Sequence, residues 1–152
     1  MVVGEFSNMR FTEEHAYGYT VELWRQGDRV IGLLEASEGL AGDTPTGRLD
    51  EVQFELRSGA LSFKAKLTMG VVRSAMGREE PSHDLFEFRG TLGREALVGT
   101  MKHSDMLQPE AKPAISHVRL RRGSGEEMMR ASSYAEWQDS VDEILRRRGP
   151  KW

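Results

Sequence analysis

Four histidines are the side chains of this sequence with the widest chemical range. They are His15, His83, His103 and His117, and each lies in or beside a predicted connection between strands. Histidine binds divalent metals and haem, and it titrates close enough to neutral pH to serve as an acid or a base. No His-x-His or His-Glu-x-x-His spacing places two ligands together locally. We therefore predict no metal site and no cofactor, with a histidine-bound metal or haem as the alternative.

A second set of polar residues is expected to converge at one end of the fold. Strand alternation puts His103 on an inner face, and it puts Tyr17 and Asp50 at the ends of the inward rows of their strands. Such a trio beside an apolar cavity could polarise a carbonyl group or move a proton. If the protein is an enzyme, these three residues are the catalytic candidates. The alternative is a rim of polar side chains that closes a packed core.

Other signatures of catalysis are missing from the sequence. The chain contains no cysteine, which excludes disulfides, thiolate catalysis and cysteine-bound metal or iron–sulfur sites. The glycine-rich segment Gly39–Gly47 lacks the Gly-Lys-Ser/Thr ending of a phosphate-binding loop, and no Gly-x-Ser-x-Gly elbow occurs. No motif therefore specifies a reaction.

The composition describes one soluble domain without a strongly charged partner. The chain has 152 residues, 38% of them hydrophobic, which is enough to bury a full core. Its 21 basic and 24 acidic residues are mixed along the sequence, so no nucleic-acid partner is expected. No stretch approaches the roughly 20 apolar residues of a membrane span, and no signal-peptide pattern opens the chain. We expect a cytoplasmic protein without membrane insertion.

Alternating apolar residues predict a first β-hairpin around Gly27–Asp28. This dipeptide suits the two-residue turns that match the twist of paired strands. The turn would place Val21 opposite Leu34 and Leu23 opposite Gly32.

Two more hairpins are predicted from turns at Ser58–Gly59 and Gly93–Arg94. The second hairpin would have an apolar inner face and an outer face of opposite charges, and the third would lay aromatic rings over glycines. The predicted partners are Leu56 with Leu61, Phe54 with Phe63, Val52 with Ala65, Gln53 with Lys64 and Glu51 with Lys66, then Phe86 with Met101, Phe88 with Gly99 and Gly90 with Leu97.

Two further strands, over residues 5–11 and 117–121, bring the total to eight. Pairing the first strand with the last removes both exposed edges of the sheet. We therefore predict an all-β, eight-stranded antiparallel up-and-down barrel, with its strands between residues 5 and 122 of a single domain, residues 1–152. A two-sheet sandwich is the alternative.

A C-terminal helix is predicted over residues 132–148. Apolar residues recur there at helical spacing, Ser132 or Ser133 can cap the helix, and Gly149 followed by Pro150 ends it. We expect its apolar stripe to pack on the outward side chains of the first hairpin, which are Trp24, Ile31 and Leu33.

The connections between hairpins are long, and an up-and-down meander places all of them at one end. They are Gly39–Gly47, Gly70–Asp84 and Ser104–Ser116. A barrel with one open end can hold a small ligand among its inward side chains. Alternatively, the loops are surface insertions over a solid core. The expected ligand contacts are Tyr17, Tyr19, Leu34, Phe54, Phe63, Leu67, Phe86, Phe88, Met101 and His103.

The eight-strand meander followed by a helix resembles the calycin group of small barrels, which includes lipocalins, fatty-acid-binding proteins and avidins. Near the first strand, Gly4-Glu5-Phe6 stands where lipocalins carry Gly-x-Trp, with Phe in place of Trp. The resemblance is architectural, and it implies a non-catalytic barrel that holds a small hydrophobic or aromatic molecule. Two alternatives are an enzyme of the barrel isomerase or cyclase type and a solid barrel that serves protein interaction or homodimerisation.

Overall fold

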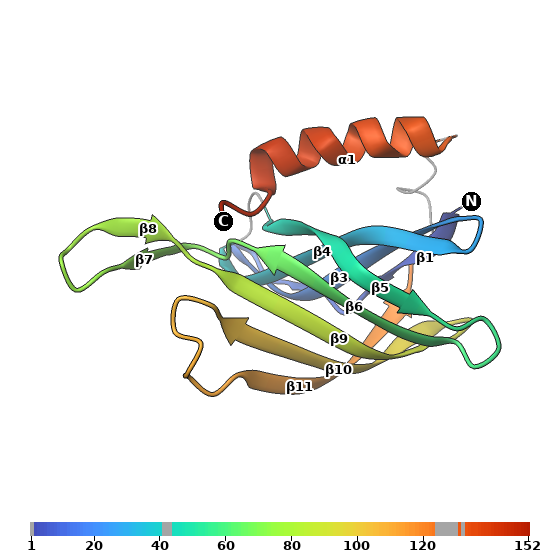
Figure 1. Ribbon diagram of the computed structural model, residues 1–152, viewed down its shortest axis with the longest axis horizontal. Helices are drawn as coiled ribbons and strands as arrows, with labels where there is room; N and C mark the ends of the chain where they lie inside the picture. Colours follow the sequence, from blue (N-terminus) through green and yellow to red (C-terminus); the bar gives the residue numbers. More distant parts are fainter. Residues whose placement is uncertain (1, 41–43, 124–130, 132) are drawn as a thin grey trace.

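The computed structural model describes residues 2–40, 44–123, 131 and 133–152, and it shows a β-barrel with one helix outside (Figure 1). The elements follow the chain in the order β1 (Val2–Ser7), β2 (Arg10–Phe11), β3 (His15–Gln26), β4 (Arg29–Leu40), β5 (Thr46–Phe54), β6 (Ala60–Leu67), β7 (Val71–Arg73), β8 (Glu79–Pro81), β9 (Asp84–Leu92), β10 (Ala96–Asp105), β11 (Ala114–Arg122) and α1 (Tyr134–Arg148).

The barrel is closed, as predicted. The strands follow the order β1-β11-β10-β9-β6-β5-β4-β3-β2, and β1 also pairs with β3, so the sheet returns to its starting strand. The eight-stranded antiparallel barrel with a C-terminal helix is therefore confirmed. Closure rests on a short seam, in which Phe6 faces Arg122 and Ser7 faces Arg121. The order contains nine labels for eight strand positions, because the expected first strand is interrupted. Its first part, β1, ends at Ser7, its second part, β2, begins at Arg10, and both pair with β3.

The first hairpin has the predicted register. Val21 faces Leu34 and Leu23 faces Gly32 across β3 and β4. Gly27 takes a φ of 60°, a left-handed conformation that glycine adopts without strain. The short turn and the regular alternation of apolar residues thus specify the same pairing.

The predicted register of the second hairpin is wrong. Phe54 faces Leu61 and Leu49 faces Ala65, because a β-bulge interrupts β5 between Asp50 and Gln53. Glu51 lies inside the bulge with a φ of 48°, which is uncommon for a residue with a side chain. The bulge reverses the inward and outward positions on its N-terminal side, so Leu49 becomes buried. Leu56, predicted inward, lies in the turn and is 68% exposed.

The third hairpin is shifted by two residues from its predicted register. Met101 faces Phe88 and Gly99 faces Gly90, with the turn centred beyond Gly93, whose N–H donates to the Ala96 carbonyl at 2.9 Å. A shift of two residues leaves each side chain on its predicted face. The ring of Phe88 therefore still covers a glycine, which is Gly90 rather than Gly99.

The helix docks where the sequence predicted. Its apolar residues Trp137 and Val141 are buried in a cluster with Trp24 and Leu33, and Ile31 packs against that cluster. Ser133 caps the helix through its side chain, which accepts from the Glu136 N–H, while Ser132 lies outside the described residues. In Figure 1 the helix lies across the outside of the barrel wall, over β4 and β5. No helix in the described ranges is long and apolar enough to span a membrane.

The two ends of the barrel differ. The tight turns lie at one end, at the right of Figure 1, while the β10–β11 connection and the β7–β8 hairpin lie at the other. The hairpin is an addition to the prediction, because it folds within the connection that was expected to be irregular. The connection after β4 is shorter than expected, since β4 extends to Leu40 and β5 begins at Thr46. We call the loop-bearing end the mouth.

Candidate binding site at the barrel mouth

Inward side chains become accessible to solvent at the mouth. On β11, Val118 is only 6% exposed, but Ser116, the next inward residue toward the mouth, is exposed. The same change occurs across the barrel, where Ala36 is 1% exposed and Glu38 is exposed. The mouth is therefore an accessible, polar region above an apolar core.

An Asp–His pair lies at the base of this region. Asp84 is the first residue of β9, His103 lies near the end of β10, and Asp84 Oδ1 is 2.7 Å from His103 Nε2. The other carboxylate oxygen, Oδ2, accepts from the Ser82 hydroxyl at 2.6 Å and from the Met69 N–H at 2.9 Å. Asp84 is 7% exposed, so these donors replace the water that it gives up. The carboxylate consequently fixes the orientation of the imidazole.

Each member of the pair favours the charged form of the other. Burial raises the pKa of Asp84, but the hydrogen bonds from His103, Ser82 and Met69 outweigh burial and lower it below its ordinary value. The hydrogen bond to Asp84 raises the pKa of His103 against the opposing effect of burial, and nearby negative charges, including Glu38, add to the increase. The imidazole is therefore protonated to a higher pH than an isolated histidine.

Aromatic side chains surround the imidazole. The ring of His103 stacks on Phe86 with 4.3 Å between centroids, and Tyr19 meets the same Phe86 ring edge-on at 5.8 Å. Burial raises the pKa of Tyr19, and the negative charge of Glu38 raises it further, so its hydroxyl stays protonated. The mouth thus presents an imidazole whose charged form is favoured and a neutral phenol.

The expected trio of Tyr17, Asp50 and His103 does not form. The prediction that Asp50 faces inward is wrong, because the β5 bulge turns it to the outer face, where it is exposed and lies opposite Lys64. Tyr17 is 46% exposed at the rim and stacks on His15 at 6.1 Å. His103 faces inward as predicted, but its partner is Asp84.

The other histidines do not join His103. His83 stacks on Trp152, with 4.9 Å between ring centroids. His117 lies near the start of β11, opposite Thr100, and is exposed on the outer face, so it does not face His103. Within the described part of the chain, no group of three His, Asp or Glu side chains could hold a metal ion.

The predicted ligand contacts divide by depth. Tyr17, Tyr19 and His103 lie at the mouth, and Phe54 is half-buried. The remaining predicted contacts are at most 2% exposed and pack together in the core; they are Leu34, Phe63, Leu67, Phe86, Phe88 and Met101. A molecule that enters from the mouth would meet Tyr17, Tyr19 and His103 before it could reach the core residues.

Asp84, Glu38 and Ser116 also belong to the mouth, although they were not among the predicted site residues. Alternation from Phe86 along its strand would have marked Asp84 as inward, and alternation from Val118 would have done the same for Ser116. Comparison of the chain with protein-family models, with curated protein sequences and with solved structures finds no match. The chemistry of the mouth must therefore be derived from its own residues.

Proposed function

We propose that this protein is a barrel that binds a small molecule at its mouth, and that the ligand has an aromatic or apolar body and an anionic or hydrogen-bond-accepting group. The observation that carries the proposal is the half-buried Asp84–His103 pair, which faces an accessible region beside Tyr19. Such a combination of a few polar groups with aromatic surface is typical of small-molecule sites.

The position of the core limits the size of the ligand. Leu34 and Met101 are the next inward residues below Ala36 and His103 on their strands, and each is at most 1% exposed. Long apolar chains, which need a deep cavity, therefore fit less well than a compact ligand that lies over Tyr19 and His103. Because His103 Nε2 is bonded to Asp84, the acceptor group of the ligand would meet the other ring nitrogen, Nδ1.

A calycin-type assignment is consistent with this proposal. Barrels of that group are closed antiparallel meanders that bind small molecules through one end, and this chain forms a closed antiparallel barrel with one accessible end. Similarity of fold alone is a weak guide to function, so the support for this proposal comes from the mouth residues.

The competing explanation is structural, because Asp84 also fastens the β6–β9 connection through Met69 and Ser82. Ligand binding distinguishes the two roles. We would titrate ¹⁵N-labelled protein with a panel of small aromatic carboxylates, phenols and fatty acids, and compare the wild type with His103→Gln and Tyr19→Phe. His117→Gln is the matched control, since it removes an exposed histidine from the outer face.

We expect shifts at residues of the mouth, binding at least tenfold weaker in His103→Gln, and unchanged binding in His117→Gln. Tenfold corresponds to about 1.4 kcal/mol, within the usual range for a hydrogen bond to a charged group. The proposal fails if no member of the panel shifts mouth resonances, or if His103→Gln binds as tightly as the wild type.

Acid–base catalysis is a second candidate function, favoured by the same pair. A carboxylate that orients an imidazole is a common arrangement for a general base, and Tyr19 provides a protonated hydroxyl nearby. Its test is to follow each bound ligand by NMR for chemical conversion or for exchange of its acidic protons with deuterium. Conversion or exchange that His103→Gln abolishes would establish catalysis, and its absence for every bound ligand would leave binding alone.

A further inference from the structure

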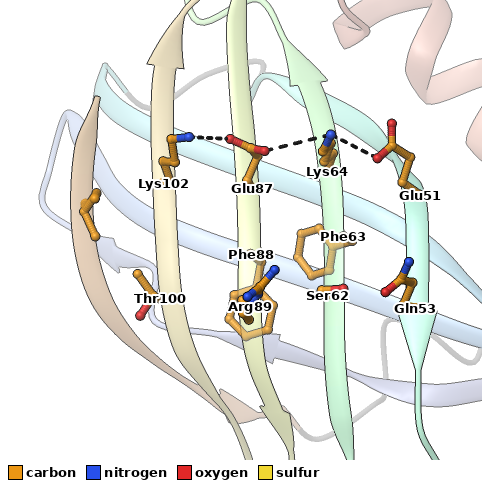
Figure 2. Close-up of a pocket in the computed structure, with 11 residues that line it drawn as sticks. Glu51, Gln53, Ser62, Phe63, Lys64, Glu87, Phe88, Arg89, Thr100 and Lys102 are labelled. Carbon is orange, nitrogen blue, oxygen red and sulfur yellow. Dashed lines mark ion pairs between the residues drawn. The ribbon is translucent and has the colours of Figure 1, made fainter. Parts of the chain in front are cut away.

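The outer face of β5, β6, β9, β10 and β11 carries a groove that is separate from the mouth (Figure 2). None of the described residues of α1 lines the groove, because the helix packs on Trp24 of β3 and Leu33 of β4 (Figure 1). The groove has a volume of about 560 Å³, which is within the range of small-molecule sites. Outward side chains from all five strands contribute to its lining.

One row of charges in the groove is internally paired. Lys64 Nζ lies 3.0 Å from Glu51 and 4.0 Å from Glu87, and Lys102 Nζ lies 3.1 Å from Glu87 (Figure 2). The row alternates negative and positive charge across four strands and is neutral as a whole. A ligand would gain little from these groups, because their partners already satisfy them.

Arg89 is different. It is exposed, and the structure gives its guanidinium no ion pair or hydrogen bond with any described residue. Its strand neighbours carry hydroxyls, Ser62 on β6 and Thr100 on β10, which lie directly opposite it in register. A second hollow, of about 340 Å³, is also lined by Arg89, together with Ser62 and Gln53. Arg89 therefore stands where the two hollows meet.

We propose that this groove binds a small organic monocarboxylate, with the carboxylate held by Arg89 and the hydroxyls of Ser62 and Thr100. A guanidinium presents two parallel N–H donors that match the two oxygens of a carboxylate. Because the neighbouring row of charges is neutral as a whole, it does not distinguish a carboxylate from inorganic phosphate, and the apolar body of the ligand has to do so. Ile115, which is 64% exposed at the β11 side of the groove, offers a surface for an apolar ligand body.

NMR titration with 4-methylpentanoate at constant ionic strength tests this inference. We expect shifts at Ser62, Thr100 and Ile115, a loss of affinity of at least tenfold in Arg89→Gln, and a smaller loss in Arg89→Lys, which keeps the charge but not the two-donor geometry. Arg119→Gln is the matched control, because Arg119 is also an exposed arginine of the outer face but does not line the groove.

Several results would overturn the inference. They are unchanged affinity in Arg89→Gln, an equal loss in Arg119→Gln, shifts confined to mouth residues, or tighter binding of inorganic phosphate than of the carboxylate. Because the groove is separate from the mouth, His103→Gln should bind the carboxylate at the groove as the wild type does. Should Arg89→Gln fail to fold, the double variant Ser62→Ala/Thr100→Val must weaken binding for the inference to stand.

Discussion

Replacement of Asp84 by Asn should destabilise the protein and lower the pKa of His103. The Asn oxygen can keep the Ser82 and Met69 donors, which both bind Oδ2, but its amide nitrogen then faces His103 Nε2 in place of Oδ1. An N–H donor at that position favours the neutral imidazole, so the charge-assisted hydrogen bond is lost. Such bonds contribute about 1.5–3 kcal/mol, and because His103 is partly accessible we expect a loss of about 1–2 kcal/mol.

The loss should depend on pH in a defined direction. The pKa of His103 is raised in the folded protein, so its contribution is complete below the ordinary value of 6.5 and disappears as the pH rises through the folded value. The pKa of Asp84 is lowered, so its contribution is present above the ordinary value of 3.8 and disappears as the pH falls through the folded value. The difference between wild type and Asp84→Asn should therefore be largest between about pH 4 and 6.5.

Urea unfolding at several pH values measures this difference, and NMR titration of the ring protons follows the protonation of His103. Asp50→Asn is the matched control, because Asp50 is exposed on the outer face, and we expect its effect to stay within about 0.5 kcal/mol. The reasoning is refuted if Asp84→Asn leaves the pKa of His103 unchanged, or if its effect on stability is the same at pH 5.5 and pH 9.

Three further variants test packing and capping by urea unfolding. Trp137→Ala removes a 3% exposed side chain that stacks on Trp24 and donates a hydrogen bond to the Glu22 carboxylate at 2.8 Å. It should lower the free energy of unfolding by about 3–5 kcal/mol. A loss below about 1 kcal/mol would contradict the docking of α1. Gly90→Ala would place its Cβ in steric conflict with the Val98 carbonyl oxygen and should cost at least about 2 kcal/mol, whereas Gly39→Ala meets open space and should be near neutral. Equal effects of the two substitutions would argue against the close approach of β9 and β10. Ser133→Ala removes the helix N-cap and should cost about 1 kcal/mol, and no change would show that the cap is dispensable.

Much of the fold could be predicted because local and long-range signals agree. In the first hairpin, the Gly27–Asp28 turn and the alternation around it specify one register. The third hairpin was predicted two residues out of register, yet its faces were correct because side chains alternate with a period of two. The register of the second hairpin could not be predicted, because no residue type in β5 indicates a bulge at Glu51, where a non-glycine residue adopts a positive φ.

The candidate site was predicted in part. Alternation along well-defined strands placed His103 on the inner face and Tyr19 among the inward ligand contacts. Asp50 was misplaced because the bulge lies between it and the rest of β5. Asp84 occupies the first position of its strand, so alternation from Phe86 marks it as inward only if the strand is taken to begin there rather than after it.

The seam between β1 and β11 gives the folding of this chain a particular order. Phe6 and Arg122 are far apart in sequence, whereas the hairpins pair residues that are close together. Pairing the first strand with the last therefore costs the most loop-closure entropy. In return it forms only a short ladder around Phe6 and Ser7 and the contacts of one side chain, Arg122. Arg122 donates hydrogen bonds to the Val3 and Arg94 carbonyls and lies over the Phe6 ring. Hairpins should form early and closure late, so the protein should fold more slowly than a helical domain of its size. During synthesis, the first strand must wait without its second neighbour until the last strand has emerged.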